Sequence, residues 1–118
     1  MRRNLFKLGV AVMIACSVVS LKAMVYHTGW MGVDGSQVYC YAMMDFSEDF
    51  TSRGIEMWLY GPNDEVLAAG AYGDSLHHVQ LEVRADSVGS GTYRCHVEFT
   101  EIEYDTERDS ADYAVYVN

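Results

Sequence analysis

Short runs of Val, Tyr, Thr and Phe alternate with turn residues along the chain, and no segment after residue 23 carries extended helical periodicity. This pattern is typical of all-β proteins. The segment Leu76–Arg84 shows it best, because Val79, Leu81 and Val83 alternate with polar residues, as in a strand with one buried and one solvated face. The predicted strands are Met24–Trp30, Gln37–Phe46, Ile55–Tyr60, Glu65–Tyr72, Leu76–Arg84, Thr92–Glu103 and Ala111–Val117.

About seven short strands in a chain of this length predict a two-sheet antiparallel sandwich or a small barrel. The segments between the strands support the assignment. Residues 32–36 and 61–64 are rich in Gly, Asp, Asn and Pro, the residues that tight turns require.

The first 23 residues have the layout of a secretory signal peptide. A basic segment ending at Lys7 precedes an uncharged apolar run from Leu8 to Val19, and small residues follow. The run has 12 residues, whereas a membrane-spanning helix needs about 20. We therefore expect residues 1–23 to be removed, leaving a single domain over residues 24–118 in a secreted or periplasmic protein. The alternative is lipidation of Cys16, which would tether the protein to a membrane.

Residues 24–118 are strongly acidic. They hold four arginines, no lysine and all 17 Asp and Glu residues of the chain, which gives a formal net charge of −13. Nucleic acids and anionic lipids are bound by clustered Lys and Arg, so the charge disfavours both as partners. It suits solubility, or the attraction of a basic partner.

Two cysteines remain after the predicted cleavage, Cys40 and Cys95. An even number of cysteines in an oxidising compartment predicts a disulfide. Strand alternation places Cys40 on the same face as Val38, and Cys95 on the same face as Val97, so both thiols are expected in one core. By the chain-entropy argument, closing the 55-residue separation stabilises the fold by about 4 kcal/mol.

Between the cysteines lies Trp58, in the segment EMWLY, and Tyr93 stands two residues before Cys95 in SGTYRC. This order of residues resembles the immunoglobulin superfamily. The resemblance implies an immunoglobulin-like antiparallel sandwich with an inter-sheet Cys40–Cys95 disulfide, Trp58 packed against it, and Tyr93 as the tyrosine corner. Gly89 departs from the family, because many members carry aspartate there. An unrelated disulfide-linked sandwich is the alternative.

The outward faces of the predicted strands carry apolar residues. Burying Cys40 leaves Tyr39, Tyr41 and Met43 on the opposite face of that strand, and burying Trp58 leaves its two neighbours outside, close to His96. Tyr and Met are enriched at protein interfaces. The candidate binding residues are Tyr39, Tyr41, Met43, Met57, Leu59 and His96, and the candidate structural residues are Cys40, Cys95, Trp58 and Tyr93.

We expect no metal, no cofactor and no catalytic activity. His77 and His78 are adjacent, so on a strand they face opposite sides, and no zinc-ligand spacing is present. The alternating acidic residues 101–109 could bind calcium weakly, although their spacing is not that of an EF-hand. A solvated acidic loop is the favoured interpretation. No nucleophile with a nearby base can be assigned.

The leading hypothesis is a secreted, non-catalytic immunoglobulin-like binding or adhesion module. It would recognise a protein or glycan through its strand faces, or through the loops near Glu48 and Asp105. The alternative is a small acidic exported inhibitor of a basic secreted enzyme, and a third class is a weakly metal-dependent or catalytic domain. We expect a monomer, or a weak homodimer through the outward residues Tyr39, Tyr41 and Met43. Salt would favour the dimer, because it screens the repulsion between the negative charges.

Overall fold

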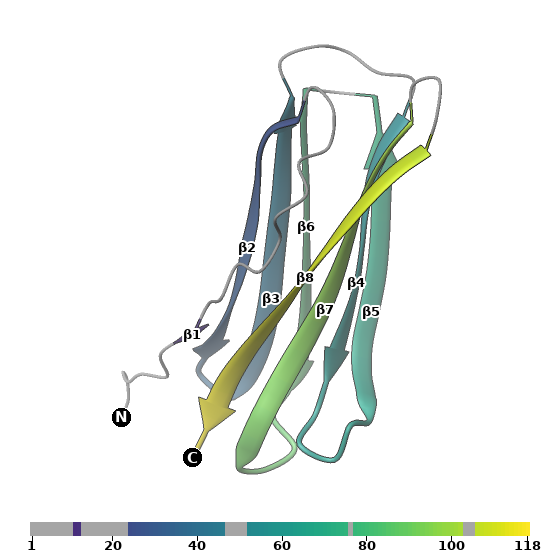
Figure 1. The fold of residues 1–118 in the computed structure, drawn as a ribbon. Coiled ribbons are helices and arrows are strands. Elements are labelled where there is room, and N and C mark those ends of the chain that lie inside the picture. Colours follow the sequence, from purple (N-terminus) through teal and green to yellow (C-terminus); the bar gives the residue numbers. More distant parts are fainter. Residues whose placement is uncertain (1–10, 13–23, 47–51, 76, 103–105) are drawn as a thin grey trace.

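The computed structural model describes residues 11–12, 24–46, 52–75, 77–102 and 106–118. Most of the predicted signal peptide lies outside these residues, as do Cys16 and the loops near Glu48 and Asp105. The described elements are all strands (Figure 1). They are β1 (Ala11–Val12), β2 (Met24–Asp34), β3 (Gln37–Phe46), β4 (Ser52–Tyr60), β5 (Val66–Asp74), β6 (His78–Asp86), β7 (Gly91–Ile102) and β8 (Thr106–Val117).

The strands form two antiparallel sheets that face each other as two layers (Figure 1). One sheet has the order β2-β3-β6, and the other has the order β1-β8-β7-β4-β5. The all-β prediction and the seven expected strands, β2 to β8, are therefore confirmed. In an immunoglobulin constant-type sandwich, the fourth strand pairs with the fifth. Counted from β2, these strands are β5 and β6, but here β5 pairs with β4 in the five-stranded sheet.

Several strands are longer than the sequence predicts. β2 continues to Asp34, which pairs directly with Gln37, so the hairpin turn shrinks to Gly35 and Ser36. Gly35 has a φ of 63°, in the left-handed region that glycine enters without a steric penalty. β8 begins at Thr106 rather than Ala111, because pairing with β7 continues along the predicted acidic loop.

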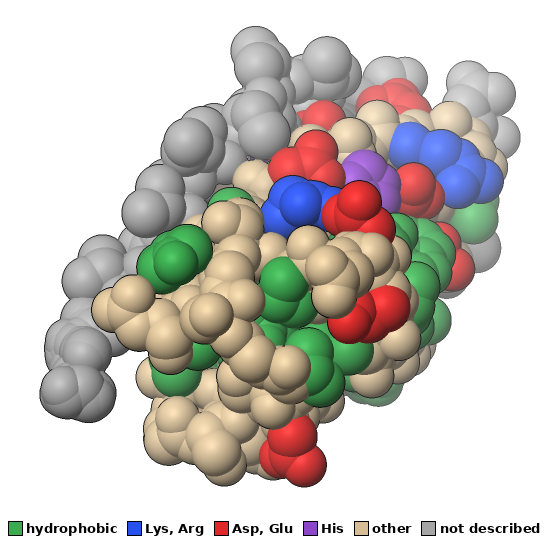
Figure 2. All heavy atoms as spheres, turned by 90° about the horizontal axis from the view of Figure 1, so that it is seen from below, with side chains coloured by type: hydrophobic (Ala, Val, Ile, Leu, Met, Phe, Trp, Pro, Cys, Tyr) green, Lys and Arg blue, Asp and Glu red, His purple; other side chains and the backbone are tan. Residues whose placement is uncertain are grey.

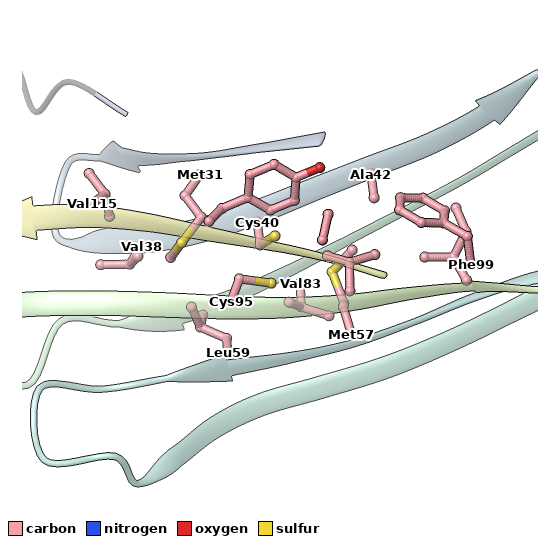
Figure 3. Packing of buried hydrophobic residues seen from close by; sticks show 14 of the residues in the cluster. Met31, Val38, Cys40, Ala42, Met57, Leu59, Val83, Cys95, Phe99 and Val115 are labelled. Atoms are coloured by element: carbon pink, nitrogen blue, oxygen red, sulfur yellow. The ribbon is translucent and has the colours of Figure 1, made fainter. Parts of the chain in front are cut away.

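The core lies between the sheets and is built from the inward row of each strand. On β3 this row includes Cys40, and on β7 it includes Cys95. Figure 3 shows these side chains converging from both layers. The buried apolar residues are Met31, Val38, Cys40, Ala42, Met44, Ile55, Met57, Leu59, Val79, Val83, Tyr93, Cys95, Val97, Phe99, Ala111, Tyr113 and Val115.

The predicted orientation of β4 is wrong. Met57 and Leu59 are fully buried, whereas Trp58 is only half-buried and lies on the outer face. The cause is the register with β7, in which Leu59 stands directly opposite Cys95 and Trp58 opposite His96. Directly opposed residues of an antiparallel pair point to the same face. Trp58 therefore does not pack against the cysteines, and Met57 and Leu59 are core residues.

The two cysteines meet where the sequence predicts, in the centre of the core. Both are buried, and their sulfurs are 2.6 Å apart (Figure 3). The structure holds them as free thiols, so their placement is confirmed and the covalent bond is not shown. Contact with the Cys95 thiol, followed by burial, raises the pKa of Cys40 far above its ordinary value.

Tyr93 ties the start of β7 to the preceding turn. Its ring is buried, and its hydroxyl donates a hydrogen bond of 2.6 Å to the carbonyl of Gly89 and accepts one of 2.9 Å from the amide of Val88. This is the bonding pattern of a tyrosine corner. Gly89 has a φ of 138°, which disfavours residues with a Cβ and accounts for glycine at this position.

We expect Tyr93→Phe to lower the free energy of unfolding by about 1–2 kcal/mol, because the Val88 amide and the Gly89 carbonyl lose their partner while the ring still fills the core. Urea denaturation followed by circular dichroism would measure the loss. Tyr116→Phe is the matched control, because Tyr116 is 59% exposed. Equal midpoints for the wild type and Tyr93→Phe would contradict the role of the hydroxyl.

Candidate functional site

The outer face of the three-stranded sheet carries the main candidate site. Because Cys40 points inward, Tyr39, Tyr41 and Met43 point outward, as predicted, and each is half-buried. Strands β2 and β6, on either side of β3, each place a row of residues directly opposite these positions. The paired outward positions are Trp30 with Tyr41, Gly32 with Tyr39, Arg84 with Tyr39, Glu82 with Tyr41 and Gln80 with Met43.

Trp30 is an exposed aromatic residue of this face. Its side chain is 38% exposed, and its ring stacks on that of Tyr41 with centroids 4.7 Å apart and a tilt of 39°. The cross-strand register causes this contact, since the two residues are directly opposed. Sequence analysis missed Trp30 as a site residue, although the inward position of its neighbour Met31 would have placed it outside.

Tyr39 lies close to Gly32 and beneath Arg84. A Cβ atom at Gly32 would come within 2.6 Å of the Tyr39 hydroxyl oxygen, so glycine leaves the space that the ring uses. The Cζ atom of Arg84 lies 5.0 Å from the centroid of the Tyr39 ring, which is a cation–π contact. Arg84 also donates from Nη1 to Asp34 over 3.0 Å and from Nε to Glu82.

These side chains enclose a hollow of about 410 Å³ that is open to solvent. Two carboxylates and one guanidinium border it, together with three aromatic rings. On the part of the surface drawn in Figure 2, basic side chains lie beside acidic ones. The lining residues are Trp30, Val33, Asp34, Tyr39, Tyr41, Glu82 and Arg84.

A polar chain continues the site along β6. The Tyr41 hydroxyl donates to Oε1 of Gln80 over 2.9 Å, and the same oxygen lies 2.9 Å from Nε2 of His78. The other ring nitrogen of His78 lies 2.6 Å from Asp45. Hydrogen bonds to Gln80 and Asp45 raise the pKa of His78. Burial, followed by the charges of Asp45 and Glu82, raises the pKa of Tyr41.

The outer face of the five-stranded sheet holds His96, at the outward position that the sequence predicts. Its ring lies 5.9 Å from that of Trp58, and its two nitrogens lie 2.8 Å from Asp112 and 3.2 Å from Glu98. Burial lowers the pKa of His96, but hydrogen bonds to Asp112 and Glu98 outweigh it, so the pKa is raised overall. Met57 and Leu59, predicted beside it, are in the core instead.

The described ends of the acidic segment, residues 101–102 and 106–109, belong to β7 and β8 and not to the solvated loop that the sequence suggests. Glu101 is 2% exposed on β7, directly opposite Arg53, which is 1% exposed. Asp109 lies 3.1 Å from Nε2 of His27 at the same end of the sandwich. These residues face inward because β7 and β8 continue as paired strands. Glu103 and Asp105 lie outside the described residues.

The described part of the chain contains no group of three or more His, Cys, Asp or Glu residues arranged to hold a metal ion. It also contains no helix long and apolar enough to cross a membrane. No protein family, curated protein or solved structure matches the chain.

The raised pKa of His96 predicts that the fold weakens above neutral pH. The protonated ring stabilises the folded state fully below its unfolded pKa of about 6.5, and this contribution is lost as pH rises through the higher folded pKa. The urea midpoint of the wild type should fall between pH 6 and pH 8.5. His96→Gln should reduce this fall, and an unchanged pH dependence in that variant would refute the assignment.

Proposed function

We propose that the protein is a secreted, non-catalytic binding module that recognises a protein or glycan partner through the outer face of β2-β3-β6. One observation carries the proposal, the open hollow beside the exposed Trp30–Tyr41 pair. Exposed aromatic rings next to hydrogen-bonded charges are typical of recognition surfaces. The proposal includes Tyr39, Tyr41 and Met43 as binding residues, and adds Trp30.

The side chains of this face are held in place before any partner arrives. Stacking restrains Trp30 and Tyr41, and two carboxylates together with the Tyr39 ring restrain Arg84. Ordering long side chains on binding costs about 0.5–1.5 kcal/mol each. A face whose side chains are already ordered avoids part of this cost, which favours recognition over a purely solvating role.

A second candidate function is inhibition of a basic secreted enzyme. The net charge of residues 24–118 is −13, and Arg84 and Arg94 are both paired with carboxylates on the protein's own surface. Such a surface attracts a basic partner at low salt. Steep weakening of partner binding by salt would favour this function over an adhesive one.

We further propose that the domain is immunoglobulin-like and that Cys40 and Cys95 become a disulfide after export. The tyrosine corner at Tyr93 and the meeting of the two cysteines between the sheets support the proposal. Oxidation would remove two protons and two electrons from the thiols, which a thiol–disulfide oxidoreductase of the exporting compartment would accept. The outward position of Trp58 departs from the family's pattern.

The same proposal includes removal of residues 1–23. β1 lies within this segment and pairs with Ala114 and Val115 at the end of β8. The main antiparallel partner of β8 is β7, which pairs with it from Thr106 to Val117. β8 therefore keeps its place in the sheet when β1 is lost.

Intact-mass measurement of the exported protein, alkylated without reductant, tests both processing steps. We expect a mass without residues 1–23, without lipid on Cys16, and without label on Cys40 or Cys95. Reduction, or the variant Cys95→Ala, should then lower the free energy of unfolding by about 2–5 kcal/mol. Labelling of both cysteines would refute the disulfide, and a diacylglycerol adduct would show a membrane-tethered protein.

The binding proposal is tested by surface variants. A ligand recovered from the protein's extracellular surroundings should bind Trp30→Ala and Tyr41→Ala at least tenfold more weakly than the wild type, as is common for buried aromatic residues at an interface. Tyr116→Ala, on the other sheet, is the matched control and should bind normally. Loss of binding in the control alone would move the site to the five-stranded sheet.

A further inference from the structure

The hollow on β2-β3-β6 has negative character. Asp34 and Glu82 border it, and Asp45 lies on the same face, where it is paired with His78. Among the described residues of these three strands, Arg84 is the only Lys or Arg. Aromatic rings present a negative π face, so the rings add to the carboxylates. An anionic ligand would meet repulsion here, and a cationic one would meet attraction.

Arg84 shows how this face holds a guanidinium group. The group lies over the Tyr39 ring and contacts one carboxylate from Nη1 and another from Nε. Arginine combines these contacts because its guanidinium is planar and offers several donors in a fixed geometry. The hollow thus already holds one arginine side chain of the protein itself, through contact with an aromatic ring and two carboxylates.

The Trp30–Tyr41 pair repeats the elements of this arrangement in the same hollow. Trp30 is the most favourable aromatic residue for cation–π contact, and its partner Tyr41 stands directly opposite Glu82 in the register. Across the sheet the order of this row is Trp30, Tyr41 and Glu82, and all three border the hollow, so a second guanidinium lying over the row could share Glu82 with Arg84.

We infer that the hollow recognises an arginine side chain presented by a partner protein, with the guanidinium stacked on Trp30 and paired with Glu82. The inference rests on the proposed binding function and specifies the chemistry of its partner. A lysine ammonium would gain less, because it cannot stack as a plane or bond in a fork. Neutral glycans would use the rings and could donate hydroxyl hydrogen bonds to the carboxylates, but they carry no positive charge to pair with them.

The test uses synthetic peptides of one length and background sequence that carry Arg, Lys, Gln or Glu at the same positions, and a neutral tetrasaccharide. The indole N–H resonance of Trp30, assigned with Trp30→Phe, would report binding by NMR titration. We expect the Arg peptide to bind, the Lys peptide to bind several-fold more weakly, and the other probes to leave the resonance unchanged.

Two variants should change the affinity for the Arg peptide in opposite directions. Trp30→Ala, measured by titration calorimetry because it lacks the indole, should weaken binding of the Arg peptide about tenfold through loss of the cation–π contact. Arg84→Gln should strengthen it about fivefold, because it frees Glu82, Asp34 and the Tyr39 ring for the incoming guanidinium. Tyr116→Ala should bind as the wild type does, and circular dichroism would show that each variant is folded.

The outcomes separate this inference from the proposed function. Failure of the Arg peptide to bind, or weaker binding in Arg84→Gln, overturns the inference. If the tetrasaccharide or the Gln peptide instead shifts Trp30, the face still binds ligands and only the chemistry of the partner is wrong. If the Arg peptide binds equally well to Trp30→Ala, both the inference and the proposed face fail.

Discussion

The contact between Cys40 and Cys95 sets the orientation of the whole sandwich. β3 and β7 are interior strands of their sheets, and each sends one cysteine into the core, where the sulfurs are 2.6 Å apart. Because side chains alternate along a strand, these two positions decide which residues of both strands are buried. Pairing then transfers the orientation to the neighbouring strands, since directly opposed residues share a face. A disulfide here would make this arrangement covalent without changing it.

The proposed binding surface is a consequence of that orientation. With Cys40 inside, Tyr39 and Tyr41 must lie outside, and the register brings Trp30 and Arg84 beside them. The inward rows are apolar except at one end, where Arg53 and Glu101 are buried opposite each other. The outer face of β2-β3-β6 combines aromatic rings with carboxylates in a single hollow. That combination is the basis of the proposed binding function.

Alternation within single strands made much of this predictable. It located the strands, the inward cysteines and the outward row from Tyr39 to Met43. It failed on β4, where Met57, Trp58, Leu59 and Tyr60 are all apolar and alternation alone does not say which side faces the core. There the resemblance to a known family suggested the wrong parity, and only the register with β7 corrects it.

The remaining features depend on cross-strand neighbours, which the sequence does not specify. The stacking of Trp30 on Tyr41 and the contact of Arg84 with Tyr39 each join residues from different strands. The inward position of Glu101 and Asp109 follows from the continuation of β7 and β8 beyond their predicted ends. Without knowledge of that pairing, the alternating acidic residues of the segment suggest a solvated loop.

The most direct test of the account is site-specific photo-crosslinking of the exported protein in its native surroundings. A photoreactive residue would replace Met43, at the rim of the aromatic face, or Tyr116, on the opposite sheet. The account predicts a discrete crosslinked product from position 43, with an arginine-containing segment of a partner protein attached, and none from position 116. A product from position 116 alone, or no product from either position, would contradict it.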